Sequence, residues 1–420
     1  MIIVETPQEQ EEFLDKFNTH PSIIVPIHND LDAHPFITDI SFLYIRIQND
    51  SYIISFNHVD CKQVEIDLSQ STTNKWVWNK KSLLQTNLGI QHLFDIQTYY
   101  FYENNRFYNL EPKEEQFLSH YTRKGLYENL GKTTPIMKWV EYLDLQFLDI
   151  PFNFTNSFVN NKLIPILSEV EKIPLRVETQ KFIDRWPQSQ KYLYNEEYVY
   201  TYYNTYTMTS RPSNRYGGIN FNALNKKDGS RNCFIPRDGK IYLQFDYDAY
   251  HVRIIGKLIG YDLPTTSVHQ WLADQYGMDY DESKGRTFRI LYGGVSEEDK
   301  EIDFFSKVDE FIQKLWVDIE QKGYLKTGQG RIIKLDWIEN PNPQKVFNYL
   351  LQATETEFNI EVLNELKLNN LPLPLLYTYD SFLFEYGTDM NTDEAKSMKQ
   401  LLEKFGFPVK ASWGMDYGEV

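Results

Sequence analysis

Two aspartates, Asp246 and Asp380, each stand at the end of an apolar run where a carboxylate could do chemistry. In the stretch 242–260, YLQFDYDAYHVRIIGKLIG, apolar and polar residues first alternate as in a β-strand and then recur at helical spacing. In the stretch 371–386, LPLPLLYTYDSFLFEY, the aspartate lies among hydrophobic residues, where a lone ionised carboxylate is costly. If two strands bring these acids together, a divalent cation between them would stabilise both charges. The alternative is a pair of solvated turn acids, because strand ends collect aspartate for reasons of turn geometry.

A third stretch combines a cation with two aromatic rings. The sequence DESKGRTFRILYGG, residues 281–294, is typical of a helix that we expect to be capped by Asp281 and ended by its glycine pair. Lys284, Phe288 and Tyr292 are four residues apart and would share one face of that helix. Such a face could hold a triphosphate and stack on a base. The alternative is a core-facing aromatic stripe with a lysine that extends along it to water.

The charge of the chain is unevenly distributed. The 420 residues carry a net charge of −16, which by itself argues against a nucleic-acid partner. Between residues 206 and 240, however, seven basic residues outnumber two acidic ones, so the local charge is +5. This basic strip suits a phosphate backbone, although a solvated loop would have the same composition. Its basic residues are Arg211, Arg215, Lys226, Lys227, Arg231, Arg237 and Lys240.

Composition sets the general class. The length allows two or three domains with a sizeable core, and hydrophobic residues make up 41% of the chain. Cys61 and Cys233, the two cysteines, form neither a disulfide framework nor a zinc signature. There is no signal peptide and no apolar run long enough to cross a bilayer. We therefore expect a cytoplasmic protein, in a bacterial cell or a virus-infected host, that is not secreted and has no membrane partner.

Several elements must position these motifs. The chain begins with an acidic amphipathic helix (ETPQEQEEFLDKF), followed by three strand-like runs (SIIVPI, FITDISFLYIRIQ and SYIISF). A helical stretch over residues 83–102 completes an α/β layer, and residues 111–205 are typical of helices joined by polar loops. The rest alternates strands and helices. We expect domain boundaries near residues 110 and 205.

Taken together, the ordered motifs of residues 206–420 resemble the DNA polymerase I family (family A). TSRPSN is similar to the family's T-x-R-x-S segment, INFNAL to the asparagine-rich turn after it, and FDYDAYHVRI to motif A. KGRTFRILYG has the K-x3-F-x3-YG spacing of motif B, and KGYLKTGQGR is similar to the turn that leads out of the fingers. YTYDSFLFE lies where motif C belongs, and FPVKASWG resembles the closing strand.

The resemblance implies a multidomain fold of α/β and α+β type. An exonuclease-like (RNase H-like) α/β domain would precede a right-hand polymerase with an antiparallel palm sheet and helical fingers. The implied domains are 1–110, a degenerate 3′–5′ exonuclease-like domain; 111–205, a helical linker and reduced thumb; 206–264, the first part of the palm; 265–325, the fingers; and 326–420, the second part of the palm.

The resemblance also implies roles for single residues. Asp246, Asp380 and the backbone carbonyl of Tyr247 would bind two Mg²⁺ ions, with Mn²⁺ able to substitute. The nucleotide would be bound by Lys284, Phe288, Tyr292, His269 and His251. The DNA would be bound by Arg211, Asn222, Arg331, Asn348 and Gln352.

Departures from the family pattern concern the sugar and the phosphates. Tyr280 stands where the family has an arginine, four residues before the motif B lysine. His251 replaces the motif A glutamate that blocks a ribose 2′-hydroxyl, so discrimination against ribonucleotides should be weaker. Motif C has Tyr379 and Ser381 around the aspartate instead of the usual histidine and glutamate. Its D-S-F sequence resembles that of the single-subunit RNA polymerases, which are relatives of the family. The sequence therefore leaves sugar choice open.

The amino-terminal region resembles the exonuclease domain in its strand pattern but not in its chemistry. Pro26 and His28 occupy the places of the D-x-E pair, and the acid expected after Asn79 is also absent. Asp95 survives, but a lone carboxylate cannot hold two metals. We predict a structural remnant without proofreading activity.

These observations predict a DNA-directed DNA polymerase, a nucleotidyltransferase of a virus or mobile element. It would extend the 3′ end of a primer with dNTPs by a two-metal mechanism, on primer-template DNA. The reduced thumb predicts distributive synthesis and an accessory processivity protein. Two alternatives stay open: a polymerase or primase that accepts ribonucleotides, and a non-catalytic nucleic-acid-binding relative that keeps the fold.

Overall fold

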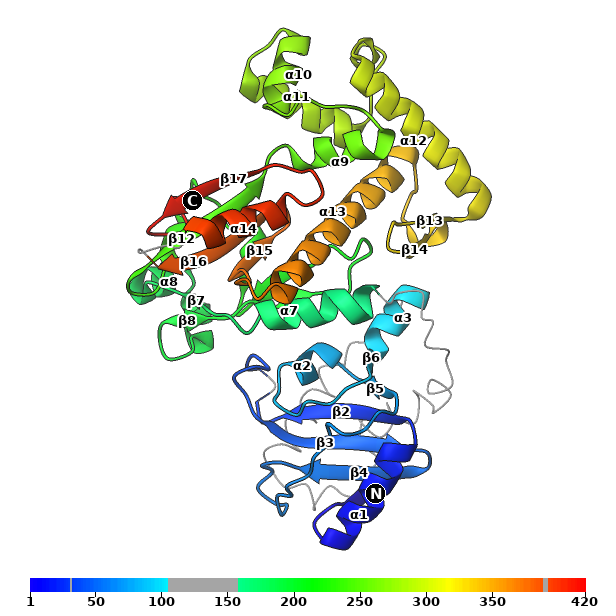
Figure 1. The fold of residues 1–420 in the computed structure, drawn as a ribbon, viewed down its shortest axis with the longest axis vertical. Helices are drawn as coiled ribbons and strands as arrows, with labels where there is room; N and C mark the ends of the chain where they lie inside the picture. The colour runs from blue at the N-terminus through cyan, green and yellow to red at the C-terminus, as the bar shows by residue number, and fades with distance from the viewer. Residues whose placement is uncertain (31, 105–157, 388–391) are drawn as a thin grey trace. The chain divides into compact units, whose positions relative to one another are not determined.

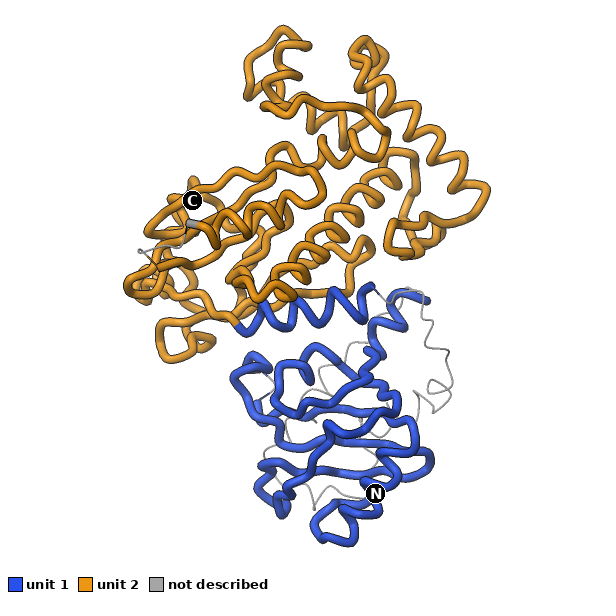
Figure 2. Tube along the Cα trace, viewed as in Figure 1, with its two compact units in different colours: residues 1–172 blue, residues 173–420 orange. Residues whose placement is uncertain are grey.

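The structure is a computed structural model that describes residues 1–30, 32–104, 158–387 and 392–420. The chain divides into two units, Met1–Lys172 and Ile173–Val420 (Figure 2). The boundaries that we expect near residues 110 and 205 are finer than this division and remain predictions. The helices expected between residues 111 and 157 lie outside the described residues.

Unit 1 is an α/β layer built on a six-stranded mixed sheet with the order β1-β4-β3-β2-β5-β6 (Figure 1). The strands are β1 (Ile2–Ile3), β2 (Ser22–His28), β3 (Ile40–Ile47), β4 (Asp50–Ser55), β5 (Lys75–Val77) and β6 (Leu93–Asp95). The helices are α1 (Pro7–Thr19), α2 (Lys80–Leu84), α3 (Ile96–Asn104) and α7 (Ile164–Val170), and α7 follows a π-helical turn at Val159–Leu163.

The first helix and the three long strands form where the sequence predicts them. Helix α1 begins with a capping box, in which Thr6 accepts from the N–H of Glu9 and Glu9 accepts from the N–H of Thr6. Its apolar residues Phe13 and Phe17 are fully buried, and Phe13 packs edge-on against Tyr52 of β4. The hydrophobic face of α1 thus covers the sheet, as its periodicity indicates.

The prediction of a continuous helix over residues 83–102 is wrong for the middle of that range. Helix α2 ends at Leu84, and Leu93–Asp95 form strand β6, which pairs in parallel with Lys75–Val77 of β5. Helix α3 begins only after this strand. A three-residue strand at a sheet edge has no periodicity of its own, so its pairing with a distant strand overrides the local pattern.

Unit 2 is built around a four-stranded antiparallel sheet with the order β15-β16-β12-β17. Its strands are β15 (Leu376–Thr378), β16 (Ser381–Gly387), β12 (Lys240–Tyr247) and β17 (Val409–Gly414). Smaller sheets are formed by β7 (Leu175–Arg176) with β8 (Tyr198–Val199), by β9 (Tyr203–Asn204), β10 (Ser213–Tyr216) and β11 (Ile219–Asn220), and by β13 (Tyr324–Lys326) with β14 (Ile332–Lys334).

The helices of unit 2 are α8 (Thr179–Arg185), α9 (Tyr250–Ile259), α10 (Val268–Tyr276), α11 (Tyr280–Gly293), α12 (Asp303–Lys322), α13 (Pro343–Leu368) and α14 (Thr392–Leu402). Short 3₁₀ turns lie at Pro187–Tyr192, Phe221–Ala223, Ser230–Cys233, Asp299–Glu301 and Leu335–Trp337. Helices α13 and α14 are tied to the four-stranded sheet (Figure 1). Asn359 of α13 donates to the hydroxyl of Tyr377 in β15, and the hydroxyl of Tyr247 in β12 donates to the carbonyl of Leu402 in α14.

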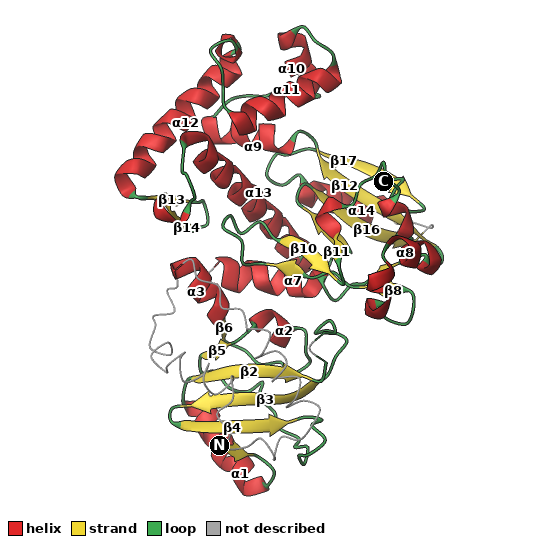
Figure 3. Cartoon of the chain, turned by 180° about the vertical axis from the view of Figure 1, so that it is seen from behind, coloured by secondary structure: helices red, strands yellow, loops and turns green. Residues whose placement is uncertain are grey.

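Helices α10, α11 and α12 extend from the sheet as a helical group (Figure 3). The helix that carries Lys284 is capped by Asp279, not by Asp281, and so begins two residues earlier than that cap predicts. The Asp279 carboxylate accepts from the N–H groups of Asp281 and Glu282, so Asp281 lies in the first turn. Two nearby aspartates can serve as a cap, and only the backbone conformation distinguishes them. In the described ranges, none of the helices combines the length and the hydropathy needed to cross a membrane.

Candidate active site

The two aspartates of the apolar runs lie side by side at one end of the four-stranded sheet. Asp246 of β12 is paired with Ser381 of β16, and Asp380 immediately precedes Ser381. Thr378 and Ser381 pair with each other, so Tyr379 and Asp380 form a two-residue hairpin turn. The N–H of Tyr247 donates to the carbonyl of Asp380 at 2.9 Å, which fixes this turn against β12. We call Asp246 and Asp380 the carboxylate pair.

The backbone beside the carboxylate pair adopts the left-handed conformation at two residues with side chains. Ala249, between β12 and α9, has φ = 48°, and Tyr379 has φ = 59°. Such residues cost about 1–3 kcal/mol each and persist where the surrounding contacts impose them. At Tyr379 the carbonyl accepts from Nδ2 of Asn359 at 2.5 Å, and the guanidinium of Arg211 lies 3.5 Å from the ring centroid. Non-glycine residues in this conformation concentrate at functional sites.

The electrostatics of the carboxylate pair favour a bound cation. Burial and the neighbouring Asp380 raise the pKa of Asp246 to about 6. Asp380 is exposed at the turn, yet the protein packed around it displaces water and raises its pKa, and the nearby Glu355 raises it further. Carboxylates whose ionised forms are destabilised by burial and by neighbouring acids are stabilised by a cation placed between them.

The donor set fits a divalent ion that is shared with a substrate. Besides the carboxylate pair, Tyr247 can offer only its main chain, because its phenol donates to Leu402 and its ring stacks on Tyr250 at 4.0 Å. In the part of the chain that the structure describes, no group of three or more His, Cys, Asp or Glu side chains could hold a metal. Mg²⁺ bound here would therefore take its other ligands from phosphate oxygens and water, as is usual for this ion.

A pocket connects the carboxylate pair to helix α11. It is lined by Arg211, Asp246, Tyr247, Asp248, Ala249, Tyr250, His251, Val252, His269, Tyr280, Lys284, Phe288, Tyr292, Glu355, Asp380 and Lys410. Lys284, Phe288 and Tyr292 share one face of α11, and the rings of Phe288 and Tyr292 are stacked with their centroids 6.0 Å apart. The structure thus brings together all the residues that we assign to metal and nucleotide binding.

His269 of α10 is a buried histidine that faces this pocket. Its residue is only 4% exposed, and its Nδ1 has no hydrogen-bond partner among the described residues. Burial and the charge of Lys284 lower its pKa, so the ring is neutral at pH 7. A buried imidazole with an unsatisfied nitrogen is costly unless a ligand satisfies it.

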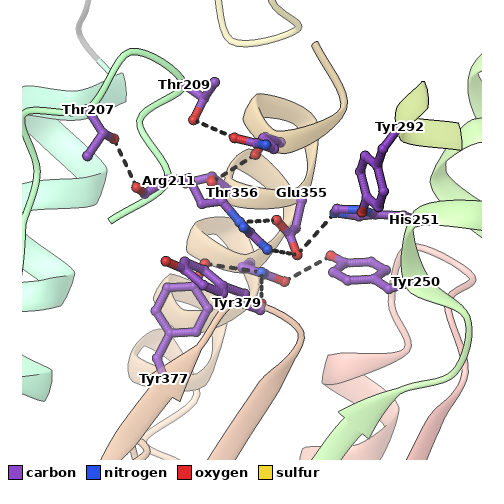
Figure 4. A network of polar contacts seen from close by, with 12 residues as sticks. Thr207, Thr209, Arg211, Tyr250, His251, Tyr292, Glu355, Thr356, Tyr377 and Tyr379 are labelled. Atoms are coloured by element: carbon purple, nitrogen blue, oxygen red, sulfur yellow. Dashed lines mark hydrogen bonds and ion pairs between the residues drawn. The ribbon is translucent and has the colours of Figure 1, made fainter. Parts of the chain in front are cut away.

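A polar network around Glu355 forms one wall of the pocket (Figure 4). Glu355 of α13 accepts from Nε and Nη2 of Arg211 at 2.6 and 3.3 Å, and its Oε1 lies 3.3 Å from Nε2 of His251. The other ring nitrogen of His251 is hydrogen-bonded to the hydroxyl of Tyr292. Burial would raise the pKa of Glu355, but His251 and Arg211 outweigh it and hold the pKa below its ordinary value. The wall is therefore an ionised carboxylate between two basic groups.

Sequence reasoning missed three charged residues of this pocket: Asp248, Glu355 and Lys410. Glu355 lies three residues after Gln352 on the same face of α13, but the polar residues around it in that helix give no local pattern that singles it out. Lys410 could not be found from the sequence, because only the strand order places it opposite Asp246.

Among the residues assigned to DNA, only Arg211 lines the pocket. Asn348 donates to the carbonyl of Tyr292 at 3.4 Å, and Gln352 accepts from Thr209 at 3.4 Å; both lie on α13, N-terminal to Glu355. Arg331 is buried and donates to the carbonyl of Met208, and Asn222 accepts from the N–H of Asn214. These four residues lie outside the pocket.

Several cations of the basic strip are bound within the fold. Besides Arg211, Arg237 pairs with Glu385 at 2.8 Å, and Lys226 donates to the main-chain oxygens of Glu419 and Val420. Arg231 donates to the carbonyl of Leu224 at 3.1 Å. Four of the seven basic residues thus have acceptors within the chain, which reduces the positive charge that the strip offers to a ligand.

In unit 1, the positions that resemble an exonuclease site are engaged in structural contacts. The Nε2 of His28 lies 2.6 Å from the hydroxyl of Ser82, and burial lowers the pKa of His28. Asp95 accepts from the N–H groups of Lys80 and Thr98 at 2.7 and 2.6 Å. Asn79 caps α2 by accepting from the N–H of Ser82.

Comparison with known proteins finds similarity to DNA polymerases in sequence and in fold. No family model matches the chain. A DNA polymerase of Mycobacterium phage L5 is 24% identical over 294 residues, which cover 61% of this chain and 47% of that protein. The chain thus spans about half the length of this curated relative. The solved POL domain of Pol1 from M. smegmatis, in complex with DNA primer-template and dNTP, matches with a TM-score of 0.71 at 14% identity, over all of both chains.

The chain has the fold of a DNA polymerase POL domain. At this level the mixed α/β fold expected from the sequence is confirmed. The phage relative is named a DNA polymerase, which is the class of enzyme that the motifs of this chain resemble.

Proposed function

We propose that this chain is a DNA-directed DNA polymerase that extends the 3′ end of a primer with dNTPs. The observation that carries the proposal is the pairing of β12 with β16, which places Asp246 beside Asp380 at the floor of a pocket closed on another side by Lys284. Paired carboxylates opposite a cation suit the transfer of a phosphoryl group from a triphosphate.

Different residues of the chain would have different roles in this reaction. The carboxylate pair and the main chain of Tyr247 would hold two Mg²⁺ ions, which, when bound, activate the primer 3′-hydroxyl and neutralise the departing pyrophosphate. Lys284 and His269 would bind the phosphates from the helical side. Phe288 and Tyr292 would pack on the incoming sugar and base, since both aromatic rings line the pocket.

The product duplex would lie beside this pocket. Arg211, Asn348 and Gln352 would contact its minor groove, with Asn222 and Arg331 supporting the surrounding backbone. In this arrangement residues 206–264 and 326–420 form the palm, residues 265–325 the fingers, and residues 111–205 a linker with a reduced thumb. Because the thumb is reduced, we propose that synthesis is distributive and that an accessory protein supplies additional contacts to the DNA.

Unit 1 would be an exonuclease-like domain without nuclease activity. His28 and Ser82 bond to each other where a metal site would need acids, and Asp95 is engaged by two backbone N–H groups. A single carboxylate in this state cannot hold two divalent ions.

A second candidate function is a polymerase that also accepts ribonucleotides. It is favoured by His251, which is drawn toward Glu355 and Tyr292 in place of a carboxylate that would exclude a 2′-hydroxyl. Comparing extension with dNTPs and with rNTPs, at equal concentration, separates the two candidates.

Primer extension by Asp246→Asn and Asp380→Asn tests the main proposal. Either change should reduce extension by about 10³-fold or more, because it removes charge at the point where the transition state develops it. Asp262→Asn is the matched control, since Asp262 is exposed and does not line the pocket. Circular dichroism and primer-template affinity should stay unchanged in all three variants. Extension at the wild-type rate by either pocket variant would refute the proposal.

A further inference from the structure

The pocket is also lined by a cation, Lys410, to which the proposed function assigns no role. Lys410 lies on β17, directly opposite Asp246 in the antiparallel pairing of β12 with β17. Residues directly opposite each other in such a pair project from the same face of the sheet. The side chain of Lys410 therefore starts on the side of the sheet that carries Asp246, and it lines the pocket together with Lys284.

An ion pair with the buried Asp248 holds Lys410 in position. Its Nζ lies 2.5 Å from Oδ1 of Asp248, whose Oδ2 accepts from Arg253 at 3.1 Å. Arg253 is itself fixed by the main-chain carbonyls of Asp248, Pro264 and Thr266, at 3.0, 3.1 and 2.9 Å. The Asp248 carboxylate thus has a rigid partner on one oxygen and directs the lysine with the other.

The charges around Asp248 leave one positive charge in excess. Arg253 alone neutralises Asp248, and both side chains are buried, with exposed fractions of 8% and 10%. Lys410 adds a second cation whose side chain remains 65% exposed. Arg253 is sufficient to neutralise Asp248, so the exposed ammonium group of Lys410 is available to an anion.

Helix α11, on the other side of the pocket, contributes few cations to it. The first turn of α11 presents Tyr280 to the pocket, so Lys284 is the cation that α11 contributes there. Lys410 acts on this region as well, since its charge and that of Lys284 both lower the pKa of His269. The buried Nδ1 of His269, which has no partner among the described residues, marks the same place as a binding site for a polar ligand.

We propose that Lys410 binds the phosphate chain of the nucleotide and forms, with Lys284, a two-lysine clamp on it. Lys284 contacts the phosphates from α11, and Lys410 contacts them from the strand that carries it. This inference rests on the proposed function, because it names a further binding residue of the same site. A triphosphate with up to four negative charges, held above two aspartates, requires cations on more than one side.

Two measurements on the full chain test the clamp, with Lys410→Ala as the variant. The first is the Kd of inorganic tripolyphosphate with Mg²⁺, by calorimetry, which needs no catalysis. The second is the KM for dNTP in primer extension. Loss of a charge-assisted hydrogen bond should raise both by about 10-fold or more, and Lys410→Arg should restore part of the affinity. The Kd for primer-template DNA should not change.

The control variant is Lys396→Ala on α14. Its ammonium group also lies near an aspartate, at 3.1 Å from Asp393, but on an exposed surface outside the pocket. Unchanged tripolyphosphate binding in Lys410→Ala would overturn the clamp, and so would a weaker Kd for DNA with unchanged KM. If the wild-type chain binds tripolyphosphate through Lys410 but does not extend primers, the proposed function fails while the binding site stands.

Discussion

Replacing His251 with glutamate should destabilise unit 2, because it places a second carboxylate against a buried one. In the structure Nε2 of His251 lies 3.3 Å from Oε1 of Glu355, and the two side chains are 10% and 1% exposed. The attraction between a basic ring and a carboxylate would become repulsion between two carboxylates. Arg211 can neutralise only one of them.

The size of the effect follows from Coulomb's law. Two unit charges about 4 Å apart interact by about 4 kcal/mol at the effective dielectric constant of about 20 that suits such sites. This corresponds to about 3 pKa units. The pair would therefore bind an extra proton in the folded state, with one carboxyl pKa raised to near 7. A raised folded-state pKa means that stability present below the unfolded pKa is lost as the pH rises.

Urea unfolding of the full chain at pH 5 and pH 8 measures this effect. His251→Glu should be close to wild type at pH 5 and about 3 kcal/mol less stable at pH 8. His251→Gln is the matched control, because it has the shape of glutamate without the charge. The double variant with Glu355→Gln should recover most of the loss, since only one carboxylate remains. Equal stability of His251→Glu and His251→Gln at pH 8 would refute the reasoning.

Three other predictions concern unit 1 and the DNA. A labelled mismatched primer incubated with the protein and Mg²⁺, without nucleotides, should stay intact; stepwise 3′ shortening that persists in Asp246→Asn would show an active nuclease. With excess trap DNA present from the start, each encounter should add few nucleotides, and products of hundreds of nucleotides would contradict the reduced thumb. Burial lowers the pKa of Lys80 in the folded state to about 8. Between pH 8 and 10 the folded state therefore loses this proton while the unfolded state keeps it, so the free energy of unfolding should rise with pH. This group should contribute up to about 3 kcal/mol to the rise. Lys80→Met should reduce this rise in denaturant titrations of the full chain, whereas the same change at the exposed Lys62 should not.

The sequence predicted those parts of the site that depend on local spacing. Asp246 follows from an alternating strand that precedes a helix, and the Lys284 face follows from a repeat of four residues. Each pattern lies within a segment of about twenty residues, and within such a segment the geometry of the helix or strand decides which side chains lie together. The capping residue was assigned wrongly, to Asp281 in place of Asp279, because both aspartates satisfy the same local rule.

The rest of the site depends on contacts between distant segments. Glu355 reaches Arg211 only because α13 packs on the four-stranded sheet, and Lys410 reaches the pocket only because β17 pairs with β12. Strand β6 was missed for the same reason, since its three residues are defined by a parallel neighbour. The periodicity of one segment does not show which distant segment it will pack against or pair with. These contacts could therefore be found only from the tertiary structure.

The uninterrupted pairing of β12 with β16, from Lys240 opposite Gly387 to Asp246 opposite Ser381, has a consequence for how such a chain can diverge. The positions of the two aspartates are set by main-chain hydrogen bonds, which substitutions other than to proline leave in place. Most side chains of these strands can therefore be exchanged while the aspartates keep their places, which is compatible with a shared fold at 14% identity. A single-residue insertion in either strand is different, because it would turn every following side chain to the opposite face of the sheet. Lineages of this fold should tolerate substitution in these strands freely and changes of strand length hardly at all.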